Sequence, residues 1–533
     1  MTSHLSEQLS EWIAGDPDPT TRDELAELSE SELAERFRAP LSFGTAGLRG
    51  VVRAGPNGMN VAVVVRTTAG ICAWLQKKCL GGSTVVVGRD ARHGSDAFAT
   101  AAAETLAAAG FSVVLLPRPL PTPVLAFAVR ALDADLGVQI TASHNPAADN
   151  GYKVYLRGGA QLVPPADKEI EAEIAAVGRA VDVPRSLVAP GGGDVTARYL
   201  DTLPALVHAS RRNIRIALTP LHGVGGEVAL TALRGLGFLD VHVVTSQFDP
   251  DPEFPTVTFP NPEEPGAADA LLALAAEVDA DLAIALDPDA DRCAIGVPGP
   301  GGWRMLSGDE TGALLADHIL KSAPPNSLVA NTIVSSQLLA ALAPARGARY
   351  ARTLTGFKWL VRAGAGLVYA YEEAIGHCVD PTSVNDKDGI SAAVMLADLV
   401  AQLKSDSRTL LDVLDDLAME FGVHAGAQVS KRVDDLGRID SMMARLRSDP
   451  PAELASRAVT MTDMLTARGP LRTDAVELAG NGIRVIVRPS GTEPKVKAYL
   501  EVVEPASSRE DLVRARATAG ATLDELRKFA RTL

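Results

Sequence analysis

Short aliphatic runs that end in a glycine or polar loop alternate with alanine-rich stretches along much of the chain. Three examples are STVVVGRDARHGS before DAFATAAAETLAAAG, NIRIALTPLHGVGG before EVALTALRGLG, and NSLVANTIVSS before QLLAALAPARG. The apolar runs have the length of strands, and the alanine-rich stretches have the periodicity of helices. Strands that feed helices in this way build parallel sheets with helices on both faces. The pattern therefore predicts an α/β fold, although we find no close sequence repeat.

The chain is several times longer than a usual domain, so three or four domains are expected in its 533 residues. Residues 1–40 have the pattern of an acidic helical extension. Related α/β domains with mixed or parallel sheets are expected over 41–205, 206–306 and 307–420, and a smaller α+β domain over 421–533. We expect the last segment to differ because it holds one clear alternating strand, IRVIVRP, before a polar loop and a charged helix.

Two boundaries between these segments carry local signals. A turn or an exposed linker is expected at GVPGPGGW, where the second α/β domain closes. The third domain opens with SGDETGALLADHIL, in which Ser307 and Glu310 have the spacing of a capping box at a helix start.

Composition narrows the class of protein. Hydrophobic residues make up 47% of the chain and charged residues 22%, which is typical of globular proteins. The formal net charge of −15 argues against a general nucleic-acid binder, although a few cations in one cleft could still hold a small anion. The four cysteines have no CxxC spacing, and neither a signal peptide nor an apolar stretch of ~18 residues is visible. We therefore expect a cytoplasmic enzyme with no nucleic-acid or membrane partner.

The first motif that could carry chemistry is TASHNP, which follows the apolar run LGVQI and contains Ser143. Ligands of parallel α/β sheets gather at the carboxyl ends of strands, so this serine is placed where a nucleophile could act. An ordinary capped turn has the same residue types. A serine hydrolase is not indicated, because the chain has no GxSxG elbow at this serine.

The second motif is DPDADR, which follows the apolar run LAIAL. Its carboxylates at Asp287, Asp289 and Asp291 could surround a hard cation such as Mg²⁺ or Ca²⁺ and leave room for water or a phosphate oxygen. An EF-hand would require glycine in place of Arg292 and an acidic residue in place of Pro298. The alternative to a metal site is an acidic, solvated loop.

The third motif is RPSGTEPKVK, after the strand IRVIV. Arg488 offers a planar fork, Ser490 and Thr492 offer hydroxyls, and Gly491 lets backbone N–H groups approach an oxyanion. These features predict a phosphate-binding loop, with a surface hairpin turn as the alternative. The order of residues is not that of a Walker A loop, so ATP is not implied.

The fourth signal is the pair YEEAIGH and NDKDGI. Adjacent glutamates could accept protons from sugar hydroxyls, and Lys387 could meet a phosphate. Charge on a helix surface and an N-cap at Asp388 would explain the same letters.

Taken together, these motifs resemble the α-D-phosphohexomutase superfamily, which includes phosphoglucomutases and phosphomannomutases. The match extends from FGTAGLRG near Phe43 to RPSGTEPK near Lys495. The resemblance implies four domains whose loops converge on one central cleft.

The resemblance also assigns roles to residues. It implies that Ser143 carries the phosphoryl group, with Arg49, His144 and Lys153 in the catalytic group and Lys153 as a general acid or base. The implied ligands of Mg²⁺ are Asp287, Asp289, Asp291 and an oxygen on Ser143. The implied substrate contacts are Arg292, Thr355, Lys358, Glu372, Lys387, Arg488, Ser490, Gly491 and Thr492.

The function implied by the resemblance is a phosphosugar mutase for the 1-phosphate and 6-phosphate of glucose or mannose. It would act through a phosphoserine and a sugar bisphosphate, with a sugar 1,6-bisphosphate as activator. Many hexose-phosphate mutases carry a serine where this sequence has Ala374. YEEAIGH is more similar to the branch that includes phosphopentomutases and glucose-1,6-bisphosphate synthases, and both activities stay open as alternatives. So do a non-catalytic sugar-phosphate binder and the oligomeric state.

Overall fold

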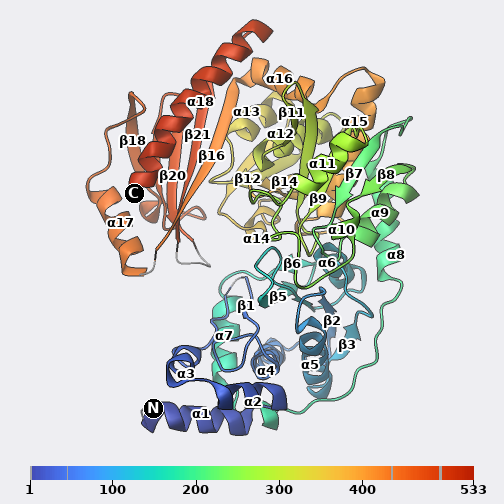
Figure 1. The fold of residues 1–533 in the computed structure, drawn as a ribbon, viewed down its shortest axis with the longest axis vertical. Helices are drawn as coiled ribbons and strands as arrows, with labels where there is room; N and C mark the ends of the chain where they lie inside the picture. The colour runs from blue at the N-terminus through green and yellow to red at the C-terminus, as the bar shows by residue number, and fades with distance from the viewer. Residues whose placement is uncertain (1–2, 45, 434–435, 491–494) are drawn as a thin grey trace. The chain divides into compact units, whose positions relative to one another are not determined.

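The computed structural model describes residues 3–44, 46–433, 436–490 and 495–533. These residues divide into two compact units and contain four sheets (Figure 1). The first unit contains the described residues up to 306 together with 376–402. The second unit contains residues 307–375 together with the described part of 403–533.

Three helices precede the first sheet, and they are α1 (Ser3–Gly15), α2 (Pro19–Glu27) and α3 (Glu30–Arg36). Side chains cap two of them, because Asp18 accepts a backbone N–H at the start of α2 and Ser29 forms a capping box with Glu32 at the start of α3. Leu25 and Leu33 bury the inner faces of these two helices.

The first sheet has the strand order β1-β5-β4-β2-β3, with β6 paired to β5. Its strands are β1 (Leu48–Val51), β2 (Thr84–Arg89), β3 (Ser112–Leu115), β4 (Leu136–Ile140), β5 (Asp149–Leu156) and β6 (Ala160–Gln161). The helical segments of this region are α4 (Val61–Lys77), α5 (Ser95–Ala108), α6 (Thr122–Ala131), α7 (Ala166–Ala176), η1 (Ala180–Asp182), α8 (Val195–Leu200) and η2 (Leu203–Leu206).

This sheet is mixed. Strands β3, β2 and β4 run parallel, but β5 runs antiparallel to both β4 and β1. The expectation of mixed or parallel α/β sheets is therefore confirmed here in its mixed form. The physical reason is that β5 returns after a short loop instead of a crossover helix, which only an antiparallel neighbour can do.

The second sheet has the order β11-β10-β9-β7-β8. Its strands are β7 (Arg215–Thr219), β8 (Asp240–Val243), β9 (Leu282–Leu286), β10 (Cys293–Gly299) and β11 (Gly302–Met305), and its helices are α9 (Gly226–Gly235), α10 (Thr245–Phe248) and α11 (Asp269–Glu277). Of the two expectations for GVPGPGGW, the turn is confirmed and the exposed linker is wrong, because the stretch forms most of the β10–β11 hairpin. Two later elements also lie wholly or mostly in this unit, namely β15 (Gly376–Cys378) and α15 (Gly389–Ser405).

The second unit begins with a capping box at Ser307 and Glu310, as their spacing predicts. Its first sheet places β13, β12 and β14 side by side and parallel. The elements of this region are α12 (Gly308–Leu320), β12 (Leu328–Thr332), α13 (Leu338–Ala345), β13 (Arg349–Thr353), α14 (Phe357–Leu360), β14 (Leu367–Glu372) and α16 (Leu410–Phe421).

The C-terminal sheet is antiparallel, in the order β16-β21-β20-β19-β18-β17. Its elements are β16 (Val423–Arg432), α17 (Leu436–Ser448), β17 (Glu453–Leu454), β18 (Arg457–Asp463), η3 (Met464–Thr466), β19 (Val476–Gly480), β20 (Ile483–Pro489), β21 (Lys495–Glu504) and α18 (Arg509–Thr532). Helix α18 lies along β16 and β21 (Figure 1). The sequence pattern predicts only β20 clearly, because the outer strands carry many exposed polar positions.

Candidate active site

Ser143 lies in the loop after β4, at the carboxyl end of the parallel strands of the first sheet. Its residue is 2% exposed, and its Oγ donates to Asp287 Oδ2 at 2.9 Å. The same Oγ lies 3.3 Å from His144 Nδ1, and the backbone N–H of Ser143 donates to Thr141 Oγ1 at 2.9 Å. The loop of the first sheet therefore meets the acidic loop of the second sheet within one unit.

The three carboxylates of DPDADR form a cluster that we call the acidic centre, made of Asp287, Asp289 and Asp291. All three residues are fully buried, and each offers a carboxylate oxygen within 4.8 Å of the others. The loop is braced from two sides, since the Val224 N–H donates to Pro288 O at 2.8 Å and the Thr122 N–H donates to Asp289 O at 2.9 Å. The alternative of a solvated acidic loop is therefore wrong.

Cations surround the acidic centre. Lys153 Nζ donates to Asp289 Oδ2 at 2.6 Å and to Asp291 Oδ2 at 3.0 Å. Lys387 Nζ lies 3.2 Å from Asp291 Oδ2, and Arg292 Nε lies 3.9 Å from Asp291 Oδ1. The lysine predicted to meet a phosphate thus lies beside the carboxylates in the first unit.

Arg49 reaches the serine loop from β1. Its Nη1 donates to Asn145 Oδ1 at 3.3 Å. The tight turn before β1 depends on Gly47, which has a φ of 75° and whose Cβ, if present, would lie 1.8 Å from Tyr152 O. The FGTAGLRG motif therefore needs this glycine to lay β1 against β5 and to aim Arg49 at the loop.

The carboxylates of the acidic centre ionise unequally. Burial and the negative charges of Asp289 and Asp291 raise the pKa of Asp287 well above its usual value. Burial alone would also raise the pKa of Asp291, but Lys153, Lys387 and the neighbouring arginine together hold that pKa below its usual value. The cations thus compensate Asp291 more fully than Asp287.

His144 is held neutral. Burial, together with the positive charges of Arg292 and Arg49, lowers the pKa of His144 well below its usual range. A neutral imidazole can accept a proton, and Nδ1 is the nitrogen that faces Ser143 Oγ. Because the Ser143 hydroxyl donates to Asp287 Oδ2, His144 Nδ1 lies next to Oγ without receiving that proton in this structure.

The acidic centre fits a metal ion. The Oδ1 atoms of Asp289 and Asp291 are buried and accept no hydrogen bond from the part of the chain that the structure describes. Buried carboxylate oxygens in this state are costly unless a cation lies nearby. Oxygen donors from three carboxylates are the ligands that Mg²⁺ takes in proteins, with open positions left for water or phosphate. We conclude that these residues could hold a magnesium ion.

Two polar contacts to this site were not expected from the sequence. Thr122 Oγ1 donates to Asp289 Oδ2 at 2.5 Å from the start of α6. Gln161 Nε2 donates to Asp386 Oδ2 at 2.8 Å, and Asp386 lies beside Lys387. A threonine at the first position of an apolar helix is the available signal for the first contact, and no sequence signal marks the second.

The predicted N-cap at Asp388 is present. Its Oδ1 accepts the backbone N–H groups of Ile390 and Ser391, both at 3.0 Å, at the start of α15. Burial raises the pKa of Asp388 to about 6.

The adjacent glutamates in YEEAIGH do not lie on a helix surface, because Glu372 ends β14 and Glu373 lies in the following turn.

In the second unit, the predicted sugar-contacting residues gather at one edge of the sheet. Thr355 and Lys358 follow β13, Glu372 ends β14, and the carboxyl ends of these parallel strands share an edge. Glu373 Oε2 accepts hydrogen bonds from Thr332 Oγ1 at 2.9 Å and Ser335 Oγ at 2.8 Å. The turn that carries the glutamates is thus held by the end of β12.

The predicted phosphate-binding loop begins at the end of β20. Arg488 and Tyr499 are joined by a side-chain hydrogen bond, and the Ser490 N–H donates to Lys495 O at 2.8 Å. Gly491 and Thr492 lie outside the described residues. Strands β20 and β21, which flank these residues in the sequence, pair antiparallel, so both interpretations of the motif stay open.

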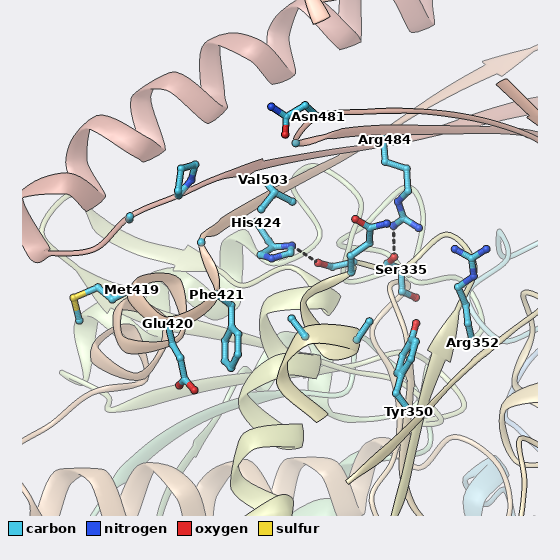
Figure 2. A pocket seen from close by; sticks show the side chains of 18 residues that line it. Ser335, Tyr350, Arg352, Met419, Glu420, Phe421, His424, Asn481, Arg484 and Val503 are labelled. Carbon is cyan, nitrogen blue, oxygen red and sulfur yellow. Dashed lines mark hydrogen bonds between the residues drawn. The ribbon is translucent and has the colours of Figure 1, made fainter. Parts of the chain in front are cut away.

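The second unit also contains a buried ionic network around Glu501, which we call the Glu501 network. Glu501 Oε1 accepts from Ser336 Oγ at 2.6 Å and from the Gln337 N–H at 2.8 Å, and it lies 3.0 Å from His424 Nδ1. Arg484 Nη2 lies 2.8 Å from Glu501 Oε2. Figure 2 shows Arg484 and His424 beside a cavity of about 1020 Å³ between α13 and the C-terminal sheet.

Four family models match the chain in order. Three describe the alpha/beta/alpha domains I, II and III of phosphoglucomutase/phosphomannomutase and match residues 40–180, 197–300 and 307–420. The fourth describes the C-terminal domain and matches residues 447–519. The chain belongs to the phosphoglucomutase/phosphomannomutase family. Its fold therefore consists of three α/β domains and a C-terminal domain, as the sequence predicts.

Individual relatives of this family agree. The chain is 43% identical to a Haemophilus influenzae protein named probable phosphomannomutase, over 83% of this chain and 93% of that protein. It is 33% identical to the phosphopentomutase of Homo sapiens, over 95% of this chain and 93% of that protein. A crystal structure from Thermus thermophilus, of a protein assigned as a phosphomannomutase, matches with a TM-score of 0.73 and 27% identity, covering 92% of this chain and 99% of that one.

Family membership makes the chain an intramolecular phosphotransferase, that is, an isomerase of the phosphoglucomutase/phosphomannomutase type. Sugar phosphates fit this family as substrates. Among the described residues, no helix is long and apolar enough to cross a membrane.

Proposed function

We propose that this enzyme interconverts the 1-phosphate and 6-phosphate of glucose or mannose through phosphorylated Ser143 and a sugar bisphosphate. The observation that carries this proposal is the 2.9 Å contact between Ser143 Oγ and Asp287 Oδ2 inside a buried acidic centre. A sugar 1,6-bisphosphate would act as the activator by placing a phosphoryl group on the serine.

The proposed cycle has two transfers. The P–O bond at Ser143 breaks as a sugar hydroxyl bonds to phosphorus, which leaves a sugar bisphosphate and a free serine. After the bisphosphate turns over, its other phosphoryl group passes to Ser143 and the product monophosphate leaves. Both transfers require positioning and neutralisation of the charge on the transferring group more than covalent help.

Asp287, Asp289 and Asp291 would hold Mg²⁺ together with an oxygen on Ser143. When bound, the ion supplies positive charge next to the transferring phosphoryl group. Arg49 and Arg292 would supply the remaining positive charge, since Arg49 contacts the serine loop and Arg292 ends the acidic loop.

Protons at the serine and at the sugar hydroxyl would be handled by two residues. Burial opposes the charge of Lys153, but Asp289 and Asp291 raise its pKa, so Lys153 is an ammonium that can donate. His144 is neutral and faces Ser143 Oγ at 3.3 Å, so it can accept the hydroxyl proton when the serine attacks.

Substrate binding would be shared among loops. Thr355, Lys358 and Glu372 lie at one sheet edge and would contact the sugar, and Lys387 would meet a phosphate. We assign the non-reacting phosphate to the loop of Arg488, Ser490, Gly491 and Thr492, because arginine and hydroxyl donors suit an oxyanion. The loop must accept either end of the bisphosphate.

A pentose phosphate is the second candidate substrate. The full-length similarity to a named phosphopentomutase and the presence of Ala374 instead of a serine in the sugar loop both support it. A glucose-1,6-bisphosphate synthase activity is the third possibility within the same site chemistry.

An activity panel tests these proposals. The purified enzyme with Mg²⁺ is given glucose 1-phosphate, mannose 1-phosphate or ribose 1-phosphate, each with and without the matching bisphosphate. We expect the largest kcat/KM for a hexose 1-phosphate and an increase on adding bisphosphate. A larger kcat/KM for ribose 1-phosphate would replace the hexose assignment with the pentose assignment, and net accumulation of bisphosphate would indicate the synthase.

The variant Ser143→Ala tests whether the reaction passes through a phosphoserine. It should abolish turnover and the phosphate that intact mass spectrometry detects on the wild-type protein. Near-normal turnover by this variant would refute the phosphoserine mechanism.

We further propose that the enzyme acts in the cytoplasm, which localisation of a tagged full chain would test.

A further inference from the structure

The segment GRDAR, residues 88–92, begins at the end of β2 and has no role in the chemistry described so far. Its last residue, Arg92, nevertheless contacts the serine loop more extensively than any side chain discussed above. Its Nη2 donates to Ser143 O at 2.7 Å and to Asn145 O at 2.6 Å. Its Nη1 donates to Pro146 O at 2.7 Å and to Asp149 O at 3.1 Å. One guanidinium thus binds four backbone carbonyls of the loop that presents the nucleophile.

Arg92 is itself held firmly. It is 4% exposed, and its own N–H donates to Asp90 Oδ1 at 3.0 Å. Its Nε lies 3.4 Å from Asp90 Oδ2, and its guanidinium carbon lies 4.9 Å from the centre of the Phe254 ring. The ion pair with Asp90 and the aromatic face of Phe254 therefore flank the guanidinium on two sides.

The serine loop needs such support. Ser143 has a φ of 54°, a left-handed conformation that a non-glycine residue rarely adopts without help from its surroundings. Buried carbonyl groups also require donors, and a loop offers no strand neighbour to supply them. Arg92 meets both needs, because its rigid fork fixes the directions of the four carbonyls at once.

We infer that Arg92 is a positioning residue that holds the Ser143 loop so that Oγ stays aligned with the acidic centre during phosphoryl transfer. The inference rests on the proposed function of Ser143 as the phosphorylated residue. Lysine could not replace the arginine, since one ammonium has neither the planar fork nor the reach to bind four carbonyls.

The experiment compares Arg92→Lys and Arg92→Ala with the wild-type enzyme in the presence of Mg²⁺. The readouts are kcat and KM on the preferred sugar 1-phosphate, and the rate at which Ser143 is phosphorylated by the bisphosphate in a single turnover. We expect kcat and the phosphorylation rate to fall roughly 100-fold in both variants, because a misplaced nucleophile reacts slowly. KM should change less than about threefold, because the contacts of Arg92 are to the serine loop, Asp90 and Phe254 and not to the residues proposed to bind the substrate.

Guanidinium rescue separates positioning from general stability. Low millimolar guanidinium chloride should restore at least about tenfold of the lost rate to Arg92→Ala, since the small cation can reoccupy the site, and should not rescue Arg92→Lys. The control variant Arg89→Ala, which removes an arginine that pairs with the exposed Asp96 at 2.8 Å, should keep kcat within about twofold. A fall in kcat that guanidinium does not restore would overturn the positioning role, and so would normal kcat in both Arg92 variants.

Amide hydrogen exchange supplies a readout that does not depend on catalysis. Peptides that cover residues 141–151 should exchange about tenfold faster in Arg92→Lys, while peptides from the second unit should be unchanged. If the wild-type protein proves to carry no phosphate on Ser143, the proposed function fails. Faster exchange of residues 141–151 in Arg92→Lys would still show that Arg92 holds the serine loop. If exchange at 141–151 is unchanged in a folded Arg92→Lys variant, the inference about Arg92 fails by itself.

Discussion

The acidic centre of the first unit and the Glu501 network of the second unit both bury carboxylates among cations. The carboxylate oxygens of the two regions differ in how many of their hydrogen bonds are formed. Glu501 is bound by an arginine, a histidine, a hydroxyl and a backbone N–H. In the acidic centre, Oδ1 atoms of Asp289 and Asp291 accept no hydrogen bond from the described residues. The carboxylates of both regions are buried, so burial by itself does not distinguish a functional site from a structural one.

The two regions differ in how fully neighbouring cations and hydrogen-bond donors pair with their buried negative charge. A fully paired buried charge stabilises the packing of the elements that carry it, and here Arg484 also donates to Ile333 O at 3.0 Å. Carboxylates that are crowded together and only partly paired cost stability in the folded state unless a further cation binds. The acidic centre therefore has the character of a binding site, and the Glu501 network has the character of a structural tie.

The largest effect that would break this comparison is on turnover. Asp287→Asn removes one charge from the acidic centre while keeping an acceptor for the backbone N–H of Arg292. We expect a loss of about 10³-fold in kcat, since about 4 kcal/mol of charge stabilisation in the transition state would go. The midpoint of thermal unfolding without Mg²⁺ should stay the same or rise, because burial and then the charges of Asp289 and Asp291 raise the pKa of Asp287 and so disfavour its charged form. A large fall in that midpoint would make the acidic centre a structural site.

The next largest effect is on stability. Glu501→Gln leaves Arg484 buried beside a neutral amide, so the free energy of unfolding should fall by about 3 kcal/mol. Urea unfolding followed by the fluorescence of Trp359, the one tryptophan of the second unit, measures it. An unchanged unfolding free energy would show that the network contributes nothing.

The same variant has a pH signature. Burial opposes ionisation of Glu501, but His424 and Arg484 lower its pKa from 4.5 to about 2. Because this folded-state pKa is depressed, the stabilisation is present above pH 4.5 and is lost as pH falls towards about 2. The unfolding free energy of the wild-type second unit should therefore decrease across this range more steeply than that of Glu501→Gln. Parallel pH profiles would contradict the pKa shift.

The next smaller effect is the stabilisation by Mg²⁺, which should depend on the acidic centre and not on the Glu501 network. Mg²⁺ at about 100 times its Kd should stabilise the wild-type protein by about 2.7 kcal/mol, as ligand linkage requires. Calorimetric titration and thermal unfolding with and without EDTA check this. Asp287→Asn should lose most of the shift and Glu501→Gln should keep it. An equal shift in both variants would place the magnesium site elsewhere.

The smallest effect is expected for an exposed ion pair. Arg157, whose side chain is 62% exposed, lies 2.7 Å from Oδ1 of the exposed Asp133 and 3.3 Å from Oδ1 of Asp135, whose side chain is mostly buried. Arg157→Ala should change the unfolding free energy of the first unit by less than about 0.5 kcal/mol, because solvent screens such pairs. A loss as large as that of Glu501→Gln would mean that burial is not what separates strong from weak pairs in this protein.

Much of the first-unit site could be predicted from sequence because its residues follow recognisable strands. Ser143 comes after LGVQI and Asp287 after LAIAL, and both apolar runs are strands in the structure. The antiparallel course of β5 and β10 could not be predicted, because a strand has the same residue pattern in either direction. The Thr122 contact to Asp289 was missed for a related reason, since it joins residues 167 positions apart.

By itself, the sequence determined where β4 and β9 end and which polar residues follow them, because hydrophobic periodicity and turn chemistry are local properties. Only the tertiary structure decided that Arg484 faces Glu501 and that Arg92 clamps the Ser143 loop. Burial of a charge depends on what packs against it, and that partner comes from a distant part of the chain.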